Sequence, residues 1–308
     1  MAEYTWHMNA ASVQVIEVGP RDGLQNEPVT LSVEQKVTYV ESLVKAGLRR
    51  IEVVSFVNPA RVPQMAGAEE VMAAVPRTDG VSYAGLVLNE RGLDRALAAG
   101  VDEVNVVIVA SETFSQRNQG ASITESSAMA ARVVSRAQDA GLRTTVTIAA
   151  AFGCPFEGEV PTDRVTELAR RCDVSGVDEI ALADTIGVAV PADVRRVVSA
   201  VREVTGRPLR LHLHNTRNTG YANAITAVEM GVAALDASSG GIGGCPFAPN
   251  ATGNIATEDL VYLLSRSGID SGLALDDLLT PSALVAQLLG APVPSLLPRA
   301  GNFPGRQP

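Results

Sequence analysis

Short runs of Val, Ile and Leu recur along the chain, and each is followed by a segment whose apolar positions have helical spacing. This alternation is typical of βα units that build a parallel sheet. In one helical segment, Val33–Ala46, the apolar residues form a single stripe, and Gly47 supplies the expected stop. Another helix is predicted to open at Pro191. The predicted strands are Val13–Glu17, Arg50–Val54, Val81–Leu86, Glu103–Val109, Thr144–Ala149, Glu179–Ala183, Leu209–His214 and Ala234–Ser238.

Eight βα units in a chain of 308 residues favour a (β/α)8 TIM barrel. A doubly wound sheet would more often have fewer strands and a glycine-rich nucleotide turn, and no G-x-G-x-x-G follows the first strand. We predict one barrel domain over residues 1–308, with its core at residues 13–290. Asp276–Leu289 is predicted to add a short helical extension, and residues 291–308 a poorly ordered tail.

The composition narrows the class of protein. Lys and Arg number 25 against 34 Asp and Glu, so the net charge of −9 argues against nucleic-acid and membrane-surface partners. The three cysteines include no CxxC pair, which argues against a disulfide framework or a cysteine zinc site and favours a reducing, cytoplasmic compartment. No secretory leader pattern and no long apolar run is present, so we expect an unprocessed soluble protein.

Polar side chains gather where the predicted strands end, which in such barrels is the site of catalysis. His212 and His214 alternate with Leu213 on one strand, so both imidazoles should share a face and point into the barrel. Either could be a hydrogen-bonded core histidine. Together with a carboxylate from another strand end, such as Asp22, they suit a divalent cation with open positions. Oxygen donors without a thiolate favour Mg²⁺ or Mn²⁺ over structural zinc.

Arg21 and Asp22 stand in an Arg-Asp-Gly turn, which by itself is more often a surface loop. At a barrel mouth, Asp22 could bind the cation while Arg21 offers donors to charge that develops on a substrate oxygen. Glu52 lies in an otherwise apolar strand, where a carboxylate is costly unless it is paired or at the mouth. We therefore expect Glu52 to point inward.

The last candidate residues lie after the eighth strand. Gly240–Gly244 lacks the Lys-Ser/Thr of a phosphate loop and is interpreted as a mobile loop. Cys245 follows it, so its thiol could swing over a bound substrate; the alternative of a buried structural thiol fits Cys172 and Cys154 better. Asn254 could be a turn residue or a neutral oxygen ligand, and spacing alone favours the turn.

Taken together, these residues resemble the 3-hydroxy-3-methylglutaryl-CoA lyase family, metal-dependent barrel enzymes that cleave carbon–carbon bonds. The similarity runs from about Val13 to Leu264. The segments that carry it are Val18–Glu27, Ser55–Val57, Val62–Met65, Asp184–Gly187, His212–His214, Gly243–Phe247 and Gly253–Leu260. The related Claisen-type synthases share the Arg-Asp and His-x-His elements, whereas the Gly-Gly-Cys-Pro loop resembles the lyases in particular.

The resemblance implies a role for each candidate residue. It implies retro-Claisen cleavage of an acyl-CoA substrate, most simply 3-hydroxy-3-methylglutaryl-CoA, by a homodimer. His212 or Asp184 would be the base, Cys245 the proton donor, and Arg21 the group that meets the enolate, with Glu52 in support. Gln25 and Thr185 would line the pocket. The implied metal ligands are Asp22, His212, His214 and Asn254.

Two departures from the family pattern concern the substrate's distal end. Pro28 stands where these lyases usually carry Lys, and Arg217 follows the histidines where they carry Tyr. Arg217 could fold over the mouth and meet a carboxylate, or point into solvent. A citramalyl-type CoA ester or another branched 3-hydroxyacyl-CoA is therefore an alternative substrate, a Claisen-type synthase is an alternative enzyme, and a non-catalytic barrel is the remaining alternative.

Overall fold

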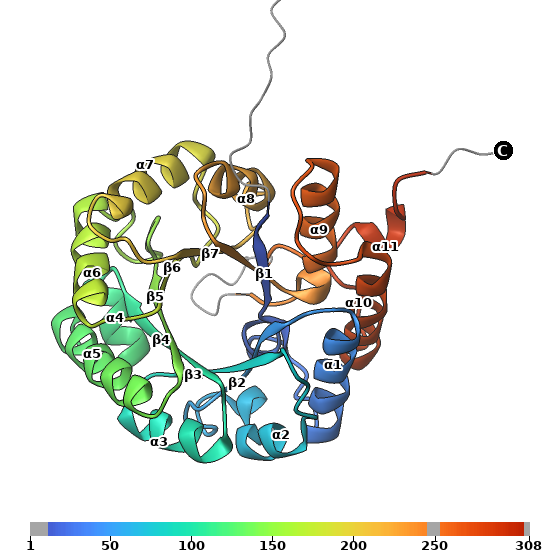
Figure 1. The fold of residues 1–308 in the computed structure, drawn as a ribbon, viewed down its shortest axis with the longest axis horizontal. Coiled ribbons are helices and arrows are strands. Elements are labelled where there is room, and N and C mark those ends of the chain that lie inside the picture. Colours follow the sequence, from blue (N-terminus) through green and yellow to red (C-terminus); the bar gives the residue numbers. More distant parts are fainter. Residues whose placement is uncertain (1–11, 245–252, 305–308) are drawn as a thin grey trace, which may run out of the picture.

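The computed structural model describes residues 12–244 and 253–304, and its sheet is a closed barrel of eight parallel strands in chain order, with β8 paired to β1. Figure 1 looks down this barrel. Each observed strand boundary lies within one residue of the predicted one. The strands are β1 Gln14–Glu17, β2 Arg50–Ser55, β3 Ser82–Val87, β4 Glu103–Val109, β5 Arg143–Ala149, β6 Glu179–Asp184, β7 Leu209–Leu213 and β8 Ala234–Ala237. The predicted TIM barrel is confirmed.

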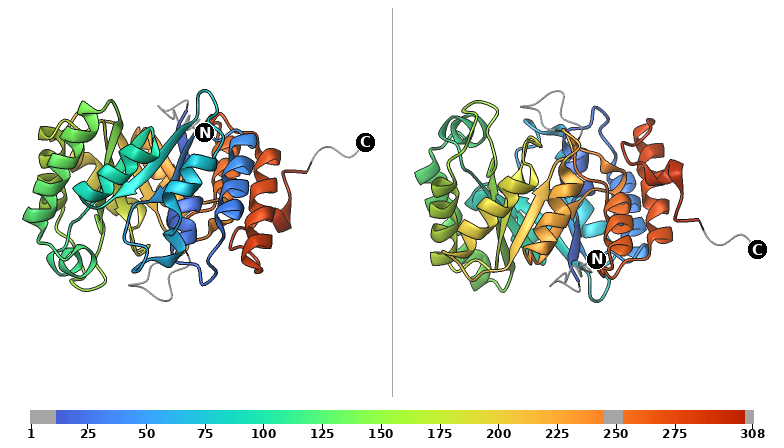
Figure 2. Two further views of the ribbon diagram at one scale, coloured as in Figure 1. Left: turned by 90° about the horizontal axis from the view of Figure 1, so that it is seen from below. Right: turned by 90° about the horizontal axis from the view of Figure 1, so that it is seen from above.

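Helices surround the barrel, and the side views in Figure 2 show them against its outer face. Their apolar stripes pack on the β-branched residues of the strands, as the helical spacing predicts. Among the described residues, no helix combines the length and apolar character needed to cross a membrane. The helices are α1 Val33–Lys45, α2 Ala68–Ala74, α3 Glu90–Ala99, α4 Glu112–Gln119, α5 Ile123–Asp139, α6 Thr162–Val174, α7 Pro191–Arg202, α8 Gly220–Glu229, α9 Thr257–Arg266, α10 Leu275–Leu289 and α11 Leu297–Ala300. Residues 12–244 and 253–304 also contain three short helical turns, η1 Gly19–Gly23, η2 Pro63–Met65 and η3 Ser239–Gly241.

The interior of the barrel is ionic at the N-terminal ends of the strands. The buried guanidinium of Arg50 donates to Glu103 Oε2 at 2.7 Å and to both carboxylate oxygens of Glu179 at 2.7 and 2.8 Å. Thr145 donates to Glu103 Oε1 at 2.8 Å. These hydrogen bonds compensate the cost of burying charge. The ionic group therefore fills the barrel axis at this end, where apolar side chains would otherwise pack.

The C-terminal segment corrects one expectation. Backbone N–H groups of Leu296 and Leu297 donate to the carboxylate of Asp259 on α9, at 2.9 and 2.8 Å, and Leu297 is buried. Ser295 N–H also donates to the Gly240 carbonyl at 3.0 Å. The prediction of a poorly ordered tail is therefore wrong for residues 295–300, because these backbone hydrogen bonds and the buried Ser295 and Leu297 hold the segment against the barrel.

The hydrogen bond from Ser295 to Gly240 also corrects the interpretation of Gly240–Gly244 as a mobile loop, at least at the start of that segment. Gly240 and Gly241 are buried in η3, and Gly240 N–H donates to Glu258 Oε2 at 3.1 Å. Gly240 has φ +75°, and a Cβ there would lie 2.8 Å from Val293. This start of the segment is thus packed, and glycine is required by both its backbone conformation and its neighbour.

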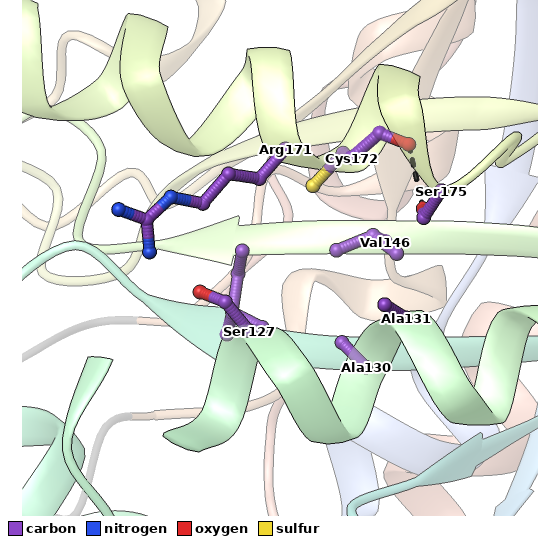
Figure 3. Close-up of a pocket in the computed structure, with 8 residues that line it drawn as sticks. Ser127, Ala130, Ala131, Val146, Arg171, Cys172 and Ser175 are labelled. Carbon is purple, nitrogen blue, oxygen red and sulfur yellow. Dashed lines mark hydrogen bonds between the residues drawn. The ribbon is translucent and has the colours of Figure 1, made fainter. Parts of the chain in front are cut away.

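A cleft between α5 and α6, over β5, lies among the outer helices rather than at the barrel mouth (Figure 3). Small side chains of α5, such as Ala130 and Ala131, face Cys172 of α6 across it. Burial raises the pKa of the Cys172 thiol to about 12. A thiol that stays protonated is a weak nucleophile, so Cys172 fits the structural role that the sequence favours.

Candidate metal centre and active site

The ends of β1 and β7 bring three candidate metal ligands together. The Nε2 atoms of His212 and His214 are 3.0 Å apart, and they lie 3.8 and 3.9 Å from Asp22 Oδ2. One ligand atom from each residue falls within 4.8 Å of the others, so the group could hold a metal ion. Both imidazoles are buried and turn to the same side of β7, as the alternation of a strand predicts.

Asp22 reaches this point because the chain leaves β1 in a tight π-helical turn, η1. The Val18 carbonyl accepts hydrogen bonds from the N–H groups of Arg21, Asp22 and Gly23 at 2.7–3.2 Å. A Cβ at Gly23 would lie 2.8 Å from Ile242, so only glycine lets η1 pack this closely on the segment after β8. The surface-loop interpretation of the Arg-Asp-Gly turn is therefore wrong.

Arg21 links Asp22 to Glu52 in the barrel mouth. Its guanidinium donates through Nη1 to Asp22 Oδ1 at 2.7 Å and through Nε to the Glu52 carboxylate. Glu52 points inward, as expected, and also accepts from Asn105 Nδ2 at 2.8 Å. Burial alone would raise the pKa of Asp22, but the charges of Arg21 and the two imidazoles outweigh it and hold that pKa well below its usual range.

The two histidines differ in their protonation. Burial and the neighbouring His212 lower the pKa of His214 to about 4. Burial also lowers the pKa of His212, but the hydrogen bond to Asp236 and the charge of Asp22 outweigh it and leave the pKa raised. His214 is therefore neutral at pH 7 and able to act as a ligand, while His212 Nδ1 is held 3.1 Å from Asp236 Oδ2.

Asn254 completes the group. Residues around it lie beside β7: Asn254 forms a bridge with His214, and Ile255 N–H donates to the Leu213 carbonyl at 3.2 Å. Asn254 Nδ2 donates to Asp22 Oδ2 at 2.9 Å, whereas its buried Oδ1 has no hydrogen-bond partner among the described residues. Two facing imidazole nitrogens, a carboxylate and an unpartnered amide oxygen are a donor set that fits a divalent cation.

Asp184 and Thr185, at the end of β6, support a loop. The Asp184 carboxylate accepts from Val188 and Ala189 N–H at 2.9 and 3.0 Å, and Thr185 Oγ1 accepts from Ala150 N–H at 2.9 Å. Burial raises the pKa of Asp184 in spite of these bonds. The observed contacts thus give both residues a part in fixing the β6–α7 loop, and their catalytic and pocket roles stay predictions.

Arg217 is exposed, which agrees with the solvent-facing alternative considered from the sequence. Its Nη1 donates to the carbonyls of Ile186 and Gly187, both at 3.0 Å, so the side chain lies on the outside of the β6–α7 loop. Gln25 follows η1, and its buried Oε1 has no hydrogen-bond partner in the described part of the chain. Cys245 lies outside the described residues.

Glu17 ends β1 but does not join the metal ligands. Its carboxylate accepts from Gly19 N–H at 2.8 Å, Ser239 N–H at 2.9 Å and Thr257 Oγ1–H at 2.7 Å. Burial raises the pKa of Glu17 to about 8 against these stabilising bonds, and the nearby charge of Glu258 adds to the rise. Glu17 therefore ties η1 to the segment after β8, and burial makes ionisation of its carboxyl group costly.

The substitution Glu17→Gln should remove a pH dependence of stability. Because the pKa of Glu17 rises from about 4.5 to about 8 on folding, its favourable contribution is present below pH 4.5 and is lost as the pH rises through 8. Glutamine can keep the same acceptor and donate to Thr257. Above pH 8 the variant should gain on the order of 5 kcal/mol relative to the parent, measured by urea unfolding across pH. The exposed control Glu203→Gln should leave the dependence of the unfolding free energy on pH unaltered. If Glu17→Gln showed the same pH dependence as the parent protein, the assignment of that dependence to Glu17 would be wrong.

Two residues that the sequence analysis missed stand under the metal ligands. Arg210 precedes His212 by two positions on β7, so it shares their face, and its Nε donates to the Asp236 carboxylate. Asp236 is a buried acid in the otherwise apolar β8. The signals that singled out Glu52 and the histidines, a charge in an apolar strand and period-two spacing, point equally to this pair.

The model of the family described as HMGL-like matches residues 12–285. The chain belongs to the HMGL-like family. It is 42% identical over 284 residues to the hydroxymethylglutaryl-CoA lyase of Bacillus subtilis, covering 92% of this chain and 95% of the relative. It is 43% identical over 304 residues to the (R)-citramalyl-CoA lyase of Chloroflexus aurantiacus, covering 94% and 95%.

A solved structure extends the similarity to three dimensions. An HMG-CoA lyase of Acinetobacter baumannii, in complex with coenzyme A and 3-methylmalate, superimposes with a TM-score of 0.92 at 39% identity, covering 97% of this chain and 98% of that one. The family that the Arg-Asp, His-x-His and Gly-Gly-Cys-Pro segments indicate is thereby confirmed.

Proposed function

We propose that the protein is a divalent-metal-dependent carbon–carbon lyase that cleaves 3-hydroxy-3-methylglutaryl-CoA to acetyl-CoA and acetoacetate. The observation that carries this proposal is the meeting of Asp22, His212 and His214 beside the Arg21 guanidinium, at the mouth of a barrel of the HMGL-like family. Retro-Claisen cleavage needs both a cation site and a nearby guanidinium, because the substrate's 3-hydroxyl loses a proton while its thioester oxygen gains the negative charge of an enolate.

The proposed metal ligands are Asp22, His212, His214 and Asn254, and the ion is Mg²⁺ or Mn²⁺. When bound, it would supply positive charge that lowers the pKa of the substrate's 3-hydroxyl group. His214 is already neutral and Asp22 already ionised at pH 7, so two of these ligands need no deprotonation to accept the ion.

The residues of the chain then perform acid–base work. The base is Asp184, or His212 if its Nε2 faces the 3-hydroxyl rather than the ion, because its Nδ1 is held by Asp236. This base takes the proton of the 3-hydroxyl, the hydroxyl oxygen forms a ketone carbonyl, and the electron pair of the C2–C3 bond passes into the enolate of acetyl-CoA. Arg21, held between Glu52 and Asp22, offers N–H donors to the enolate oxygen. Cys245 gives its thiol proton to C2, which completes acetyl-CoA.

The test is an assay of the purified protein with a panel of 3-hydroxyacyl-CoA thioesters. A lyase releases acetyl-CoA and a keto acid in a metal-dependent reaction. A Claisen-type synthase would instead release free CoA from acetyl-CoA and a 2-oxo acid, and a non-catalytic barrel would do neither. Homodimer formation and a cytoplasmic location stay predictions, for size-exclusion chromatography and fractionation to examine.

A citramalyl-type CoA ester is the second candidate substrate, and two residues favour it. Pro28 offers no cation, and Arg217 lies across the carbonyls of Ile186 and Gly187. A buried carboxylate needs a donor or a cation, so the partner of the substrate's distal carboxylate decides which ester fits. We expect Arg217, in the β7–α8 connection, to be the cation that binds the substrate's distal carboxylate.

Replacing Arg217 with alanine should therefore lower kcat/KM for carboxylate-bearing thioesters by about tenfold or more, since a charge-assisted hydrogen bond contributes about 1.5–3 kcal/mol. A branched 3-hydroxyacyl-CoA without the carboxylate should change much less. Arg202→Ala is the matched control, because Arg202 donates to the Gly231 carbonyl at 2.7 Å from an exposed helix end. A preference that survives Arg217→Ala unchanged would show that another group holds the carboxylate.

A further inference from the structure

Arg210 occupies the barrel axis between the two halves of the site. Only 1% of its side chain is exposed. Its Nε donates to Asp236 Oδ1, and its Nη2 lies 3.7 Å from Glu52 Oε2. That Nη2 has no hydrogen-bond partner among the described atoms. The guanidinium is thus placed between Asp236 and Glu52, and its Nη1 lies 3.8 Å from a third carboxylate, that of Glu179.

The carboxylates of Asp236 and Glu52 each lead to a different group of the site. Asp236 Oδ2 lies 3.1 Å from Nδ1 of His212, so it fixes which imidazole nitrogen faces Asp22. Glu52 receives the Nε donor of Arg21. Arg210 is therefore connected to the metal ligand His212 through one carboxylate, that of Asp236. It is connected to Arg21, the arginine proposed to meet the enolate, through another carboxylate, that of Glu52.

We propose that Arg210 is a positioning residue that sets the orientation of His212 through Asp236 and of Arg21 through Glu52, and so couples the metal centre to the group that meets the enolate. This inference rests on the metal centre of the proposed function. Without the guanidinium, Asp236 and Glu52 would be two buried carboxylates with one fewer counter-charge between them, free to turn away from their partners.

Arg50 provides the matched comparison within the same barrel. Arg50 is also buried, and it is bonded to the carboxylates of Glu103 and Glu179. Glu179 lies near Arg210 as well, but neither Glu103 nor Glu179 contacts His212 or Arg21. If Arg210 merely neutralised interior carboxylates, replacing either arginine would have the same kind of effect. If Arg210 positions the site, only its replacement should change metal binding.

The experiment measures Mn²⁺ binding by calorimetry, without substrate, in Arg210→Met and Arg50→Met. Arg210→Met should raise the Mn²⁺ Kd about 10–100-fold, the range known for residues that orient metal ligands. Arg50→Met should lower Tm but leave Kd within about threefold. Arg210→Lys, which restores charge without the planar fork, should recover part of the affinity. Equal Kd values in the two methionine variants would overturn the proposal.

A second variant covers the case in which Arg210→Met does not fold. Asp236→Asn keeps the size of the side chain but removes the charge between Arg210 and His212, and should weaken Mn²⁺ binding at least tenfold; an unchanged Kd there would also overturn the proposal. Because these measurements need no substrate, they separate the two hypotheses. Weakened Mn²⁺ binding in a protein that cleaves no thioester would contradict only the proposed function.

Discussion

Replacing His214 with alanine should weaken Mn²⁺ binding by roughly a hundredfold or more and leave the barrel folded. The imidazole lies 3.0 Å from Nε2 of His212 and 3.9 Å from Asp22 Oδ2, so its loss removes one of the converging donors. Its Nδ1 has no hydrogen-bond partner among the described residues, so the change breaks few other contacts. Calorimetry with Mn²⁺ and a thermal melt of the metal-free protein measure the two effects separately.

Addition of free imidazole provides the control for this prediction, because it can refill the space as a ligand and should restore part of the affinity. A large fall in the Tm of the metal-free variant would mean that His214 is a structural core residue. Unchanged Mn²⁺ affinity in a folded His214→Ala protein would show that His214 is not a metal ligand and that any metal ion binds elsewhere.

Replacing Arg21 with methionine should lower kcat about 100–1,000-fold with Mn²⁺ binding retained, the range seen when one donor to a developing oxyanion is removed. Asp22 would lose the partner that holds its pKa down, but two imidazoles and the amide of Asn254 still favour its ionised form. Glu52 would keep Asn105 Nδ2 as a donor at 2.8 Å. Metal binding and transition-state stabilisation should therefore separate in this variant.

Cys245→Ser is the companion variant, since it replaces the proposed proton donor by a hydroxyl that releases its proton far less readily. Its kcat should also collapse while Mn²⁺ still binds. Steady-state kinetics for both variants, each with a measured Mn²⁺ Kd, provide the comparison. Unimpaired kcat in both would remove Arg21 and Cys245 from the mechanism.

The sequence predicts the barrel and part of the site for the same reason, which is periodicity. Strand and helix spacing give the βα units, and period two puts His212 and His214 on one face. Because the ends of parallel strands meet at one rim, Asp22 from the first strand and the two histidines from the seventh are brought together without any knowledge of contacts.

Contacts between distant segments explain what could not be predicted. Arg217 could face the mouth or solvent, and in the structure it is exposed and donates to two carbonyls of the β6–α7 loop. Glu17 ends its strand like a site residue but turns to Ser239 and Thr257. Such choices depend on which donors lie nearby after folding, and the pattern of one segment does not contain that information.

The most direct test of the central claim is cleavage of 3-hydroxy-3-methylglutaryl-CoA in D₂O by the metal-stripped protein, before and after addition of Mn²⁺. Breaking the C2–C3 bond and protonating the enolate from an exchangeable thiol should give acetyl-CoA that carries a single deuterium in its methyl group, together with an equal amount of acetoacetate. Both products should require the metal. Mass spectra that show no acetyl-CoA from the Mn²⁺-loaded protein, or the same yield without metal, would contradict the account.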